Sequence, residues 1–197
     1  MLCEKNCLMI TSKTELRDFL KSDNINYLPV SCGFLRKLKS QMLSNPISEQ
    51  KHIWNYIREM RYVEYFDFRK KTNAFYWLFY IYHLYQLRRE SHITGFQIPP
   101  NVCGKGLTIW HWGPIIINPA AKIGENCTLY PGVLIGHKNI MGGVAIIGNN
   151  VFIGAGTKII GPVKIGDNVT IGQNCVITKD IPDNSVVVCN NENRIIR

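Results

Sequence analysis

A six-residue repeat is the feature of this sequence that most constrains its fold. Reading in steps of six gives an aliphatic residue or methionine every time: Ile117, Ile123, Leu129, Ile135, Met141, Ile147, Ile153, Ile159, Ile165, Ile171 and Ile177. The residue four places later is small or β-branched in most repeats, with Asn139 as an exception. A period of six fits neither the 3.6-residue period of a helix nor the alternation of an ordinary strand.

This repeat predicts a parallel β-coil with short flat faces and a tight corner in each hexapeptide. The aliphatic residue points into a narrow core, and glycine or asparagine occupies corners where positive φ is often needed. Stacked coils bury a continuous column that no single repeat buries alone. Separate short strands in a sandwich are the alternative, but they would not give eleven consecutive matches.

The composition changes near Gly95. Residues 1–95 hold 15 Lys/Arg and 9 Asp/Glu, and residues 96–197 hold 8 and 5, whereas 14 of the 16 glycines lie in the second part. We therefore expect an α+β protein with a helical domain over residues 1–95, a β-helix over 96–190 and a tail over 191–197.

The first part contains several segments that favour helices. Thr14 can cap the segment TELRDFL, and a strongly aromatic helix is expected over residues 72–89. Packing in a core or subunit interface is the favoured interpretation of these aromatics. A membrane-surface helix or a lid is the alternative, so contact with a membrane surface stays open. We expect His52 and His83, in these segments, to be structural.

Charge and cysteine content restrict the partners and the compartment. The net charge of +9 favours anionic partners, but no nucleic-acid-binding motif accompanies it. Seven cysteines without a CxxC pair indicate a reduced, cytoplasmic protein. We expect no signal peptide, because no basic segment leads into an apolar core near residue 1. The most apolar run, residues 74–87, is too short for a transmembrane segment.

Two histidines fall within the repeat region. His111 lies between Trp110 and Trp112 and is followed by a Gly-Pro pair, so it does not fill a repeat position. Histidine is well suited to transfer protons near neutral pH, although a histidine stacked among aromatics is the structural alternative. His137 belongs to the expected outward loop, as a site residue or an exposed loop residue. Two histidines do not suffice for a metal site of the carbonic anhydrase type, so no metal is expected.

The segment from Gln97 to Val188 resembles serine acetyltransferases and their relatives in polysaccharide gene clusters. Two stretches carry the resemblance: QIPPNVCGKGLTIWHWGPIIINPAAKIGENC and NNVFIGAGTKIIGPVKIGDNVTIGQNCVITKDIP. The repeat is common to many acyltransferases, whereas the His-aromatic-Gly step followed by IIIN and AKIGENC is more specific. The resemblance implies a left-handed β-helix, a homotrimer and acetyl-CoA as acetyl donor.

The resemblance also implies an acyltransferase site between neighbouring subunits. His111 matches the family's catalytic histidine, which takes a proton from the acceptor hydroxyl while the oxygen attacks the thioester. His137 is a second catalytic candidate. The orienting group for His111 is open, with Asp67 and Glu90 as candidates by location. The residues implied in CoA binding are Gly136, His137, Gly154, Ala155, Gly172, Gln173, Lys158 and Lys179.

Two departures from the family concern the acceptor. An Asp precedes the catalytic histidine in serine acetyltransferases, where this chain has Trp110, and an Arg-His pair of their outward loop is replaced by Gly142–Val144. We therefore expect O-acetylation of a sugar hydroxyl in surface polysaccharide synthesis, with Trp110 and Trp112 binding the sugar. The alternatives are serine O-acetylation in cysteine biosynthesis and a non-catalytic trimeric β-helix scaffold.

Overall fold

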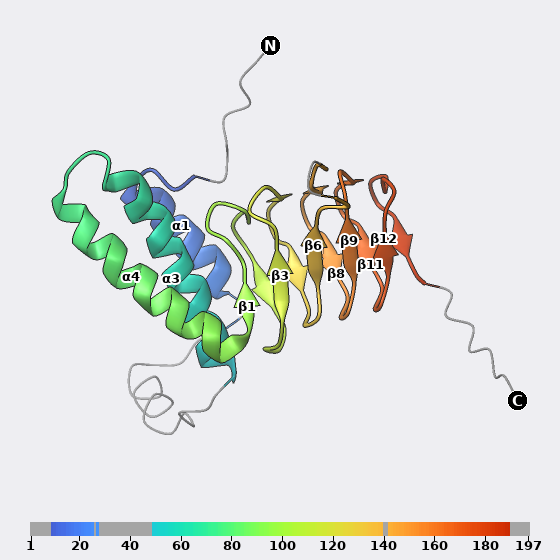
Figure 1. The fold of residues 1–197 in the computed structure, drawn as a ribbon, viewed down its shortest axis with the longest axis horizontal. Helices are drawn as coiled ribbons and strands as arrows, with labels where there is room; N and C mark the ends of the chain where they lie inside the picture. Colours follow the sequence, from blue (N-terminus) through green and yellow to red (C-terminus); the bar gives the residue numbers. More distant parts are fainter. Residues whose placement is uncertain (1–8, 26, 28–48, 140–141, 190–197) are drawn as a thin grey trace, which may run out of the picture.

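The computed structural model describes residues 9–25, 27, 49–139 and 142–189. In this part of the chain three helices precede a coil of short strands (Figure 1): α1 (Lys13–Asn24), α3 (Glu49–Arg69) and α4 (Phe75–Thr94). The strands are β1 (Phe96–Gln97), β2 (Thr108–Ile109), β3 (Ile115–Ile117), β4 (Lys122–Ile123), β5 (Thr128–Leu129), β6 (Leu134–Gly136), β7 (Ile146–Ile147), β8 (Phe152–Ile153), β9 (Lys158–Ile160), β10 (Lys164–Ile165), β11 (Thr170–Ile171), β12 (Val176–Ile177) and β13 (Val186–Val187).

The strands form three parallel sheets that make the walls of a coil. Their orders are β1-β3-β6-β9-β12, β4-β7-β10 and β2-β5-β8-β11-β13. Successive strands belong to different sheets, so the chain passes around the coil axis and each strand pairs with one a full turn away. The fold predicted from the repeat and the resemblance, a helical region followed by a left-handed β-helix, is confirmed.

The repeat positions form the core of the coil. Every described aliphatic position of the repeat is at most 6% exposed, and Met141 lies outside the described residues. The second repeat position is also buried except at Asn139, and it includes Cys127 and Cys175 at 1% and 0% exposure. Both cysteines therefore pack as small apolar residues, as expected from their place in the repeat.

Asparagines hold one corner of the coil in register. Asn126, Asn150, Asn168 and Asn184 all have φ between 56° and 58°, the left-handed region in which asparagine is better tolerated than most residues. The amide nitrogens of the first three each donate to the amide oxygen one turn further along, at 3.0–3.1 Å. This ladder satisfies the corner side chains and fixes the stacking of consecutive turns.

The first helix is capped differently from the sequence prediction. Ser12, not Thr14, is the N-cap of α1: its hydroxyl accepts the Glu15 N–H at 3.1 Å, and the Glu15 carboxylate accepts the Ser12 N–H. This reciprocal capping box satisfies two otherwise free backbone donors, which a cap at Thr14 would leave unpaired.

A buried arginine of α3 joins the helices to the start of the coil. Arg61 is fully buried and donates to Asp23 of α1 at 2.7 Å, to Glu64, and to the backbone carbonyls of Cys103 and Gly104. Burial alone would lower the pKa of this guanidinium, but the two carboxylates raise it above its ordinary value. The contacts hold α3 against the first turn of the coil.

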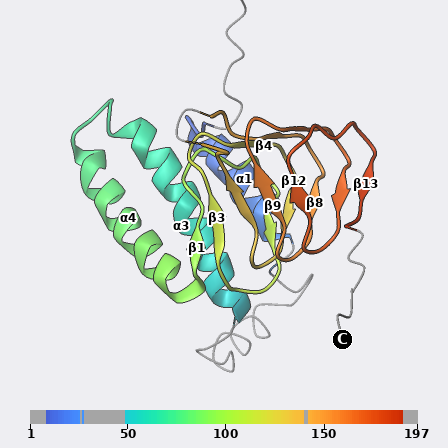
Figure 2. The ribbon, with the colours of Figure 1, turned by 45° about the vertical axis from the view of Figure 1, so that its right-hand side comes forward.

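The aromatic helix begins and ends later than residues 72–89. It packs against α3, which lies between α4 and the rest of the molecule (Figures 1 and 2). Two histidine–carboxylate pairs join the helices: His83 with Glu59 and His52 with Glu90, both at 2.7 Å. Both histidines are structural, as expected. None of the described helices is long and apolar enough to cross a bilayer.

Candidate active site

His111 lies where the wall of the coil leaves its regular path. It follows β2 and has φ of 64°, unusual for a non-glycine residue. On one side, the Trp110 N–H donates to the Leu129 carbonyl at 3.0 Å, continuing the strand pairing. On the other side, the Gly113 N–H donates to the Thr94 carbonyl at the end of α4. The backbone is therefore fixed on both sides of His111, while its side chain is 66% exposed.

The first residue of α3 holds the imidazole. The Glu49 carboxylate lies 3.2 Å from Nδ1 of His111, and it accepts the Trp112 N–H at 2.6 Å. A carboxylate is favourable at this position, because the N-terminal end of a helix carries a partial positive charge. The contact requires Nδ1 to carry the hydrogen, which leaves Nε2 of the neutral ring free to accept a proton.

This carboxylate differs from the two that sequence location suggested. Asp67 pairs with Lys70 at 2.7 Å, and Glu90 contacts His52 and Arg89. Neither contacts His111. Asp67 lies near the C-terminal end of α3, whereas Glu49 begins that helix, and the Glu90 carboxylate is taken up by its two partners. Glu49 was missed because the sequence does not show that the start of α3 meets the turn after β2. An acidic residue in a first helical turn was the only available signal.

A cavity of about 160 Å³ lies beside His111. It is lined by Tyr27, Glu49, Gln50, Ile53, Thr108, Ile109, Trp110 and His111. The Tyr27 hydroxyl donates to the Ile109 carbonyl at 3.2 Å, and burial raises the pKa of this phenol, so it stays protonated. This hydroxyl also accepts the Ile109 N–H, so it is engaged within the protein. The cavity thus offers the His111 imidazole and the Gln50 amide to a small polar molecule.

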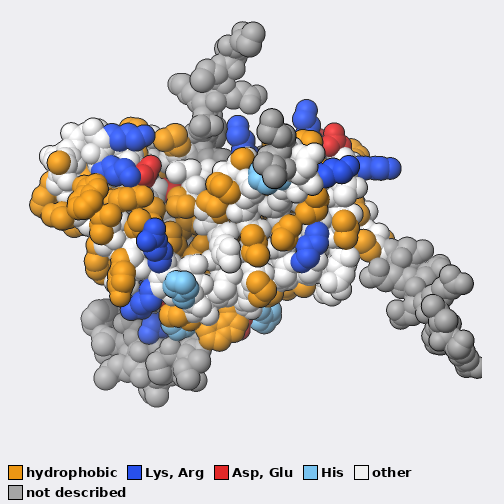
Figure 3. Space-filling view, viewed as in Figure 1, with side chains coloured by type: hydrophobic (Ala, Val, Ile, Leu, Met, Phe, Trp, Pro, Cys, Tyr) orange, Lys and Arg blue, Asp and Glu red, His pale blue; other side chains and the backbone are white. Residues whose placement is uncertain are grey.

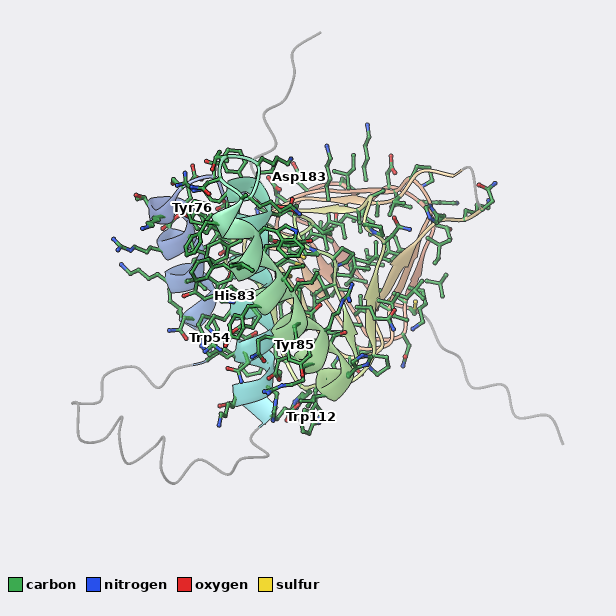
Figure 4. The ribbon with its side chains drawn as sticks, turned by 60° about the vertical axis from the view of Figure 1, so that its left-hand side comes forward. Trp54, Tyr76, His83, Tyr85, Trp112 and Asp183 are labelled. Atoms are coloured by element: carbon green, nitrogen blue, oxygen red, sulfur yellow. The ribbon has the colours of Figure 1, made fainter. Side chains whose placement is uncertain are left out.

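The two tryptophans flank the imidazole and remain partly open. Trp110 is 43% exposed and borders the cavity, while Trp112 is 36% exposed and lies 6.0 Å from the ring of His52. Figure 4 shows Trp112 at the end of the helical layer where α3 begins and α4 ends. The exposed indoles give this end of the molecule an aromatic surface next to His111.

Four of the residues implied in CoA binding lie along one corner of the coil. Gly154 and Ala155 follow β8, and Gly172 and Gln173 follow β11 one turn further on. In the same sheet, Tyr130 follows β5 and contacts the rings of both His111 and Phe152. The column from His111 to Gly172 covers three strand spacings, or about 14 Å. A Cβ at Gly154 would lie 2.7 Å from the Gly172 backbone, so stacking alone requires glycine there.

Gly136 ends β6, in another sheet, and His137 follows it at a different corner of the coil. The Asn118 amide donates to Nε2 of His137 at 2.7 Å, and Nδ1–H donates to the Gly142 carbonyl at 3.2 Å. Both ring nitrogens are therefore engaged, unlike those of His111. Within the described part of the chain, no hydrogen bond joins the two histidines.

The two candidate lysines differ in their freedom. Lys158 begins β9, and its Nζ donates to the Gly132 carbonyl. Lys179 is exposed in the turn after β12. Lys179 is therefore the better placed of the two to meet a phosphate. In the described ranges no group of three His, Cys, Asp or Glu side chains is arranged to hold a metal ion.

Part of the coil matches a known protein-family model. Residues 145–179 match the family model "Bacterial transferase hexapeptide (six repeats)". This stretch of the coil is therefore similar to the hexapeptide repeats of bacterial transferases.

Curated proteins with similar sequences include serine acetyltransferases. Those of Mycobacterium tuberculosis and Helicobacter pylori strain 26695 are 39% and 37% identical over 99 residues, 49% of this chain. The aligned region covers 43% and 58% of those proteins, so the chain spans about half the length of the curated relatives it matches.

Solved structures extend the similarity to the helices. Serine acetyltransferase isoform 3 of Entamoeba histolytica, in complex with cysteine, matches 93% of this chain and 61% of its own with a TM-score of 0.62 and 24% identity. The Neisseria gonorrhoeae enzyme in complex with serine matches 91% and 68%, with a TM-score of 0.61 and 23% identity. At these identities the structures establish a shared fold. The resemblance to serine acetyltransferase-like hexapeptide-repeat proteins, expected from the sequence, is confirmed.

Proposed function

We propose that this chain is an acetyl-CoA-dependent O-acetyltransferase whose general base is His111. The observation that carries the proposal is the Glu49–His111 contact, at the edge of a small cavity on a hexapeptide-repeat coil. An imidazole with a carboxylate on Nδ1 and a free Nε2 is the arrangement that general-base catalysis requires. The curated relatives are named as acetyltransferases, which supports the same reaction type.

The proposed reaction uses this geometry. Nε2 of His111 removes the hydroxyl proton of the acceptor as the oxygen attacks the thioester carbonyl carbon. The C–S bond then breaks, and the imidazolium returns its proton to the departing CoA thiolate. Glu49 stabilises the imidazolium formed in between and holds the ring in the required tautomer. General-base assistance of this kind contributes about 10²- to 10⁴-fold.

L-Serine is the acceptor we place first. The named activity of the curated relatives favours it over the sugar hydroxyl expected from the sequence. The cavity of about 160 Å³ supports this order, because it is smaller than the ~300–1,000 Å³ pockets of drug-sized ligands. A sugar remains the second candidate, since exposed Trp110 and Trp112 offer the flat apolar surface that a sugar ring uses.

We further propose that the donor binds between copies of the chain in a homotrimer. The candidate residues are divided between two corners of one coil: Gly154, Ala155, Gly172 and Gln173 at one, and Gly136 and His137 at the other. A neighbouring copy would bring its second corner against the first, so that one CoA molecule contacts both groups. Lys158 and Lys179 are the candidate cations for the CoA phosphates.

The test measures thiol release from acetyl-CoA by the purified full chain with L-serine and with a panel of sugars. We expect turnover with at least one acceptor, and L-serine as the best. The His111→Ala variant should lose at least about 10²-fold in turnover while keeping the mass of the wild-type oligomer. Retained turnover in His111→Ala would remove the proposed base. Failure of the wild type to bind or cleave acetyl-CoA would favour a non-catalytic scaffold.

A further inference from the structure

The outer face of α4 is apolar although it faces away from the rest of the molecule. The inner side of the helix contacts α3 through Tyr76, Phe79, His83, Leu87 and Glu90. The outer face is defined here as the opposite side, made by Trp77, Leu78, Ile81, Tyr82, Tyr85, Arg88, Arg89 and His92. Figures 1 and 2 show α4 as the outermost element of the helical layer.

Large apolar side chains dominate the first three turns of this face. Trp77 is 53% exposed, Leu78 60% and Tyr85 65%. The hydrophobic side chains gather at this end of the molecule in the space-filling view (Figure 3). A contiguous exposed patch of this kind marks an interaction surface rather than ordinary surface composition.

The exposed charged side chains on the outer face itself have one sign. Arg88 and Arg89 lie at its C-terminal end, and Lys71 precedes its N-terminal end. The only acidic residue of α4 is Glu90, which is 2% exposed and contacts His52 and Arg89. The apolar stretch is thus bounded by cations, without an exposed carboxylate on the helix.

This charge pattern does not fit pairing of the face with a second copy. A parallel pair of such helices would place the two arginines against the same arginines. An antiparallel pair would place them near the lysine that precedes the helix. Both arrangements bring cations together with no acid on α4 to compensate, and such contacts destabilise a complex.

We propose that the outer face of α4 binds an anionic membrane surface, with the helix lying parallel to it. Tryptophan and tyrosine suit the interface between headgroups and acyl chains, and aliphatic side chains enter the apolar boundary below. Arg88, Arg89 and Lys71 would then meet the negatively charged headgroups. Glu49 contacts His111 from the start of α3. Helix α3 packs between this contact and the outer face of α4.

The test is sedimentation of the full chain with phosphatidylcholine vesicles, with and without phosphatidylglycerol. We expect binding to the anionic vesicles and little to the neutral ones. Replacing Leu78 and Tyr85 together by serine, or Arg88 and Arg89 together by glutamine, should weaken binding by about tenfold or more. Two matched controls place the same changes on exposed positions of the coil and should leave binding unchanged. In one, Val176 and Val186 are replaced by serine, and in the other, Lys122 and Lys164 are replaced by glutamine.

Two results would overturn the proposal. One is equal binding of wild type and α4 variants, or no binding to anionic vesicles. The other is a smaller oligomer for the Leu78 and Tyr85 variant than for wild type in sedimentation velocity without vesicles. The outer face of α4 would then be an interface between copies. Circular dichroism of each variant verifies that these exposed substitutions leave the fold intact, and acetyl transfer to a soluble acceptor should be unchanged.

Discussion

The coil and the helical layer are stabilised in different ways. In the coil, an aliphatic side chain such as Ile153 or Ile171 has the same environment one turn after another, and the Asn126–Asn150–Asn168–Asn184 ladder repeats with it. In the helical layer the important contacts occur once each, such as Arg61 with Asp23 and Glu64. The candidate site lies where the two meet: His111 comes from the coil and Glu49 from the helices. In the proposed function, the repeated scaffold supplies the base, His111, and a unique contact with Glu49 orients it.

The unique contact of the helical layer should be the more costly one to break. Replacing Arg61 by methionine leaves Asp23 and Glu64 buried without their cation. We expect a loss of about 3–5 kcal/mol in the free energy of unfolding, measured by urea denaturation. Arg58, whose side chain is 40% exposed, is the matched control, and Arg58→Met should cost less than about 1 kcal/mol. Similar losses for both variants would contradict the role of the buried network.

A single repeat position should cost somewhat less, because neighbouring turns remain in place. Ile171 is fully buried, and Ile171→Ala should lower the free energy of unfolding by about 2–5 kcal/mol through lost burial and the cavity left behind. Ile146, on an outward position and 50% exposed, is the control, and its substitution by alanine should change stability little. Equal effects at the two positions would mean that the repeat does not form the core in solution.

At the boundary the expected effect concerns rate rather than stability. Glu49→Gln removes the charge that stabilises the imidazolium but keeps the shape of the side chain. We expect kcat for acetyl transfer to fall by about 10- to 100-fold, with a smaller change in KM, because the charge acts mainly in the transition state. Glu125→Gln makes the same change on the exposed coil, away from the cavity, and should leave kcat unchanged. A change confined to KM would make Glu49 a binding residue instead.

The smallest expected effect is a pH dependence between α3 and α4. Burial raises the pKa of Glu59, but hydrogen bonds from His83 and Arg58 outweigh it and lower this pKa below its ordinary value of 4.5. A carboxylate with a lowered folded-state pKa adds stability above its unfolded pKa and loses it as the pH falls through the folded one. The midpoint temperature of thermal unfolding should therefore fall more steeply below about pH 5 for wild type than for Glu59→Gln. Identical slopes would contradict this contribution.

The sequence predicted the two regions unequally, for a physical reason. In the coil, fold, period and buried positions follow from the repeat, since each residue's environment is set by its place in six. In the helical layer, contacts depend on how distant segments pack. Ser12 rather than Thr14 caps α1 because of a reciprocal contact with Glu15, and α4 runs to Thr94 rather than to residue 89.

In the candidate site, too, contacts between distant segments could not be predicted from the sequence. The sequence drew attention to His111 because it interrupts the repeat between two tryptophans, and its catalytic role stays a proposal. Its carboxylate partner was not, because Glu49 is 62 residues away, and Asp67 and Glu90 are equally plausible in the sequence. The roles of His137, the corner glycines and the lysines stay predictions, as do the domain boundaries at residues 95 and 190.

The central claim is that Glu49 acts through His111, and a double-mutant cycle tests it most directly. The measurement is kcat/KM for acetyl transfer by wild type, Glu49→Gln, His111→Ala and the double variant. If Glu49 only orients and stabilises the imidazole, its substitution should have almost no effect once His111 is gone, which leaves a large coupling energy. Additive losses, with Glu49→Gln costing as much in the His111→Ala background as in wild type, would contradict the account.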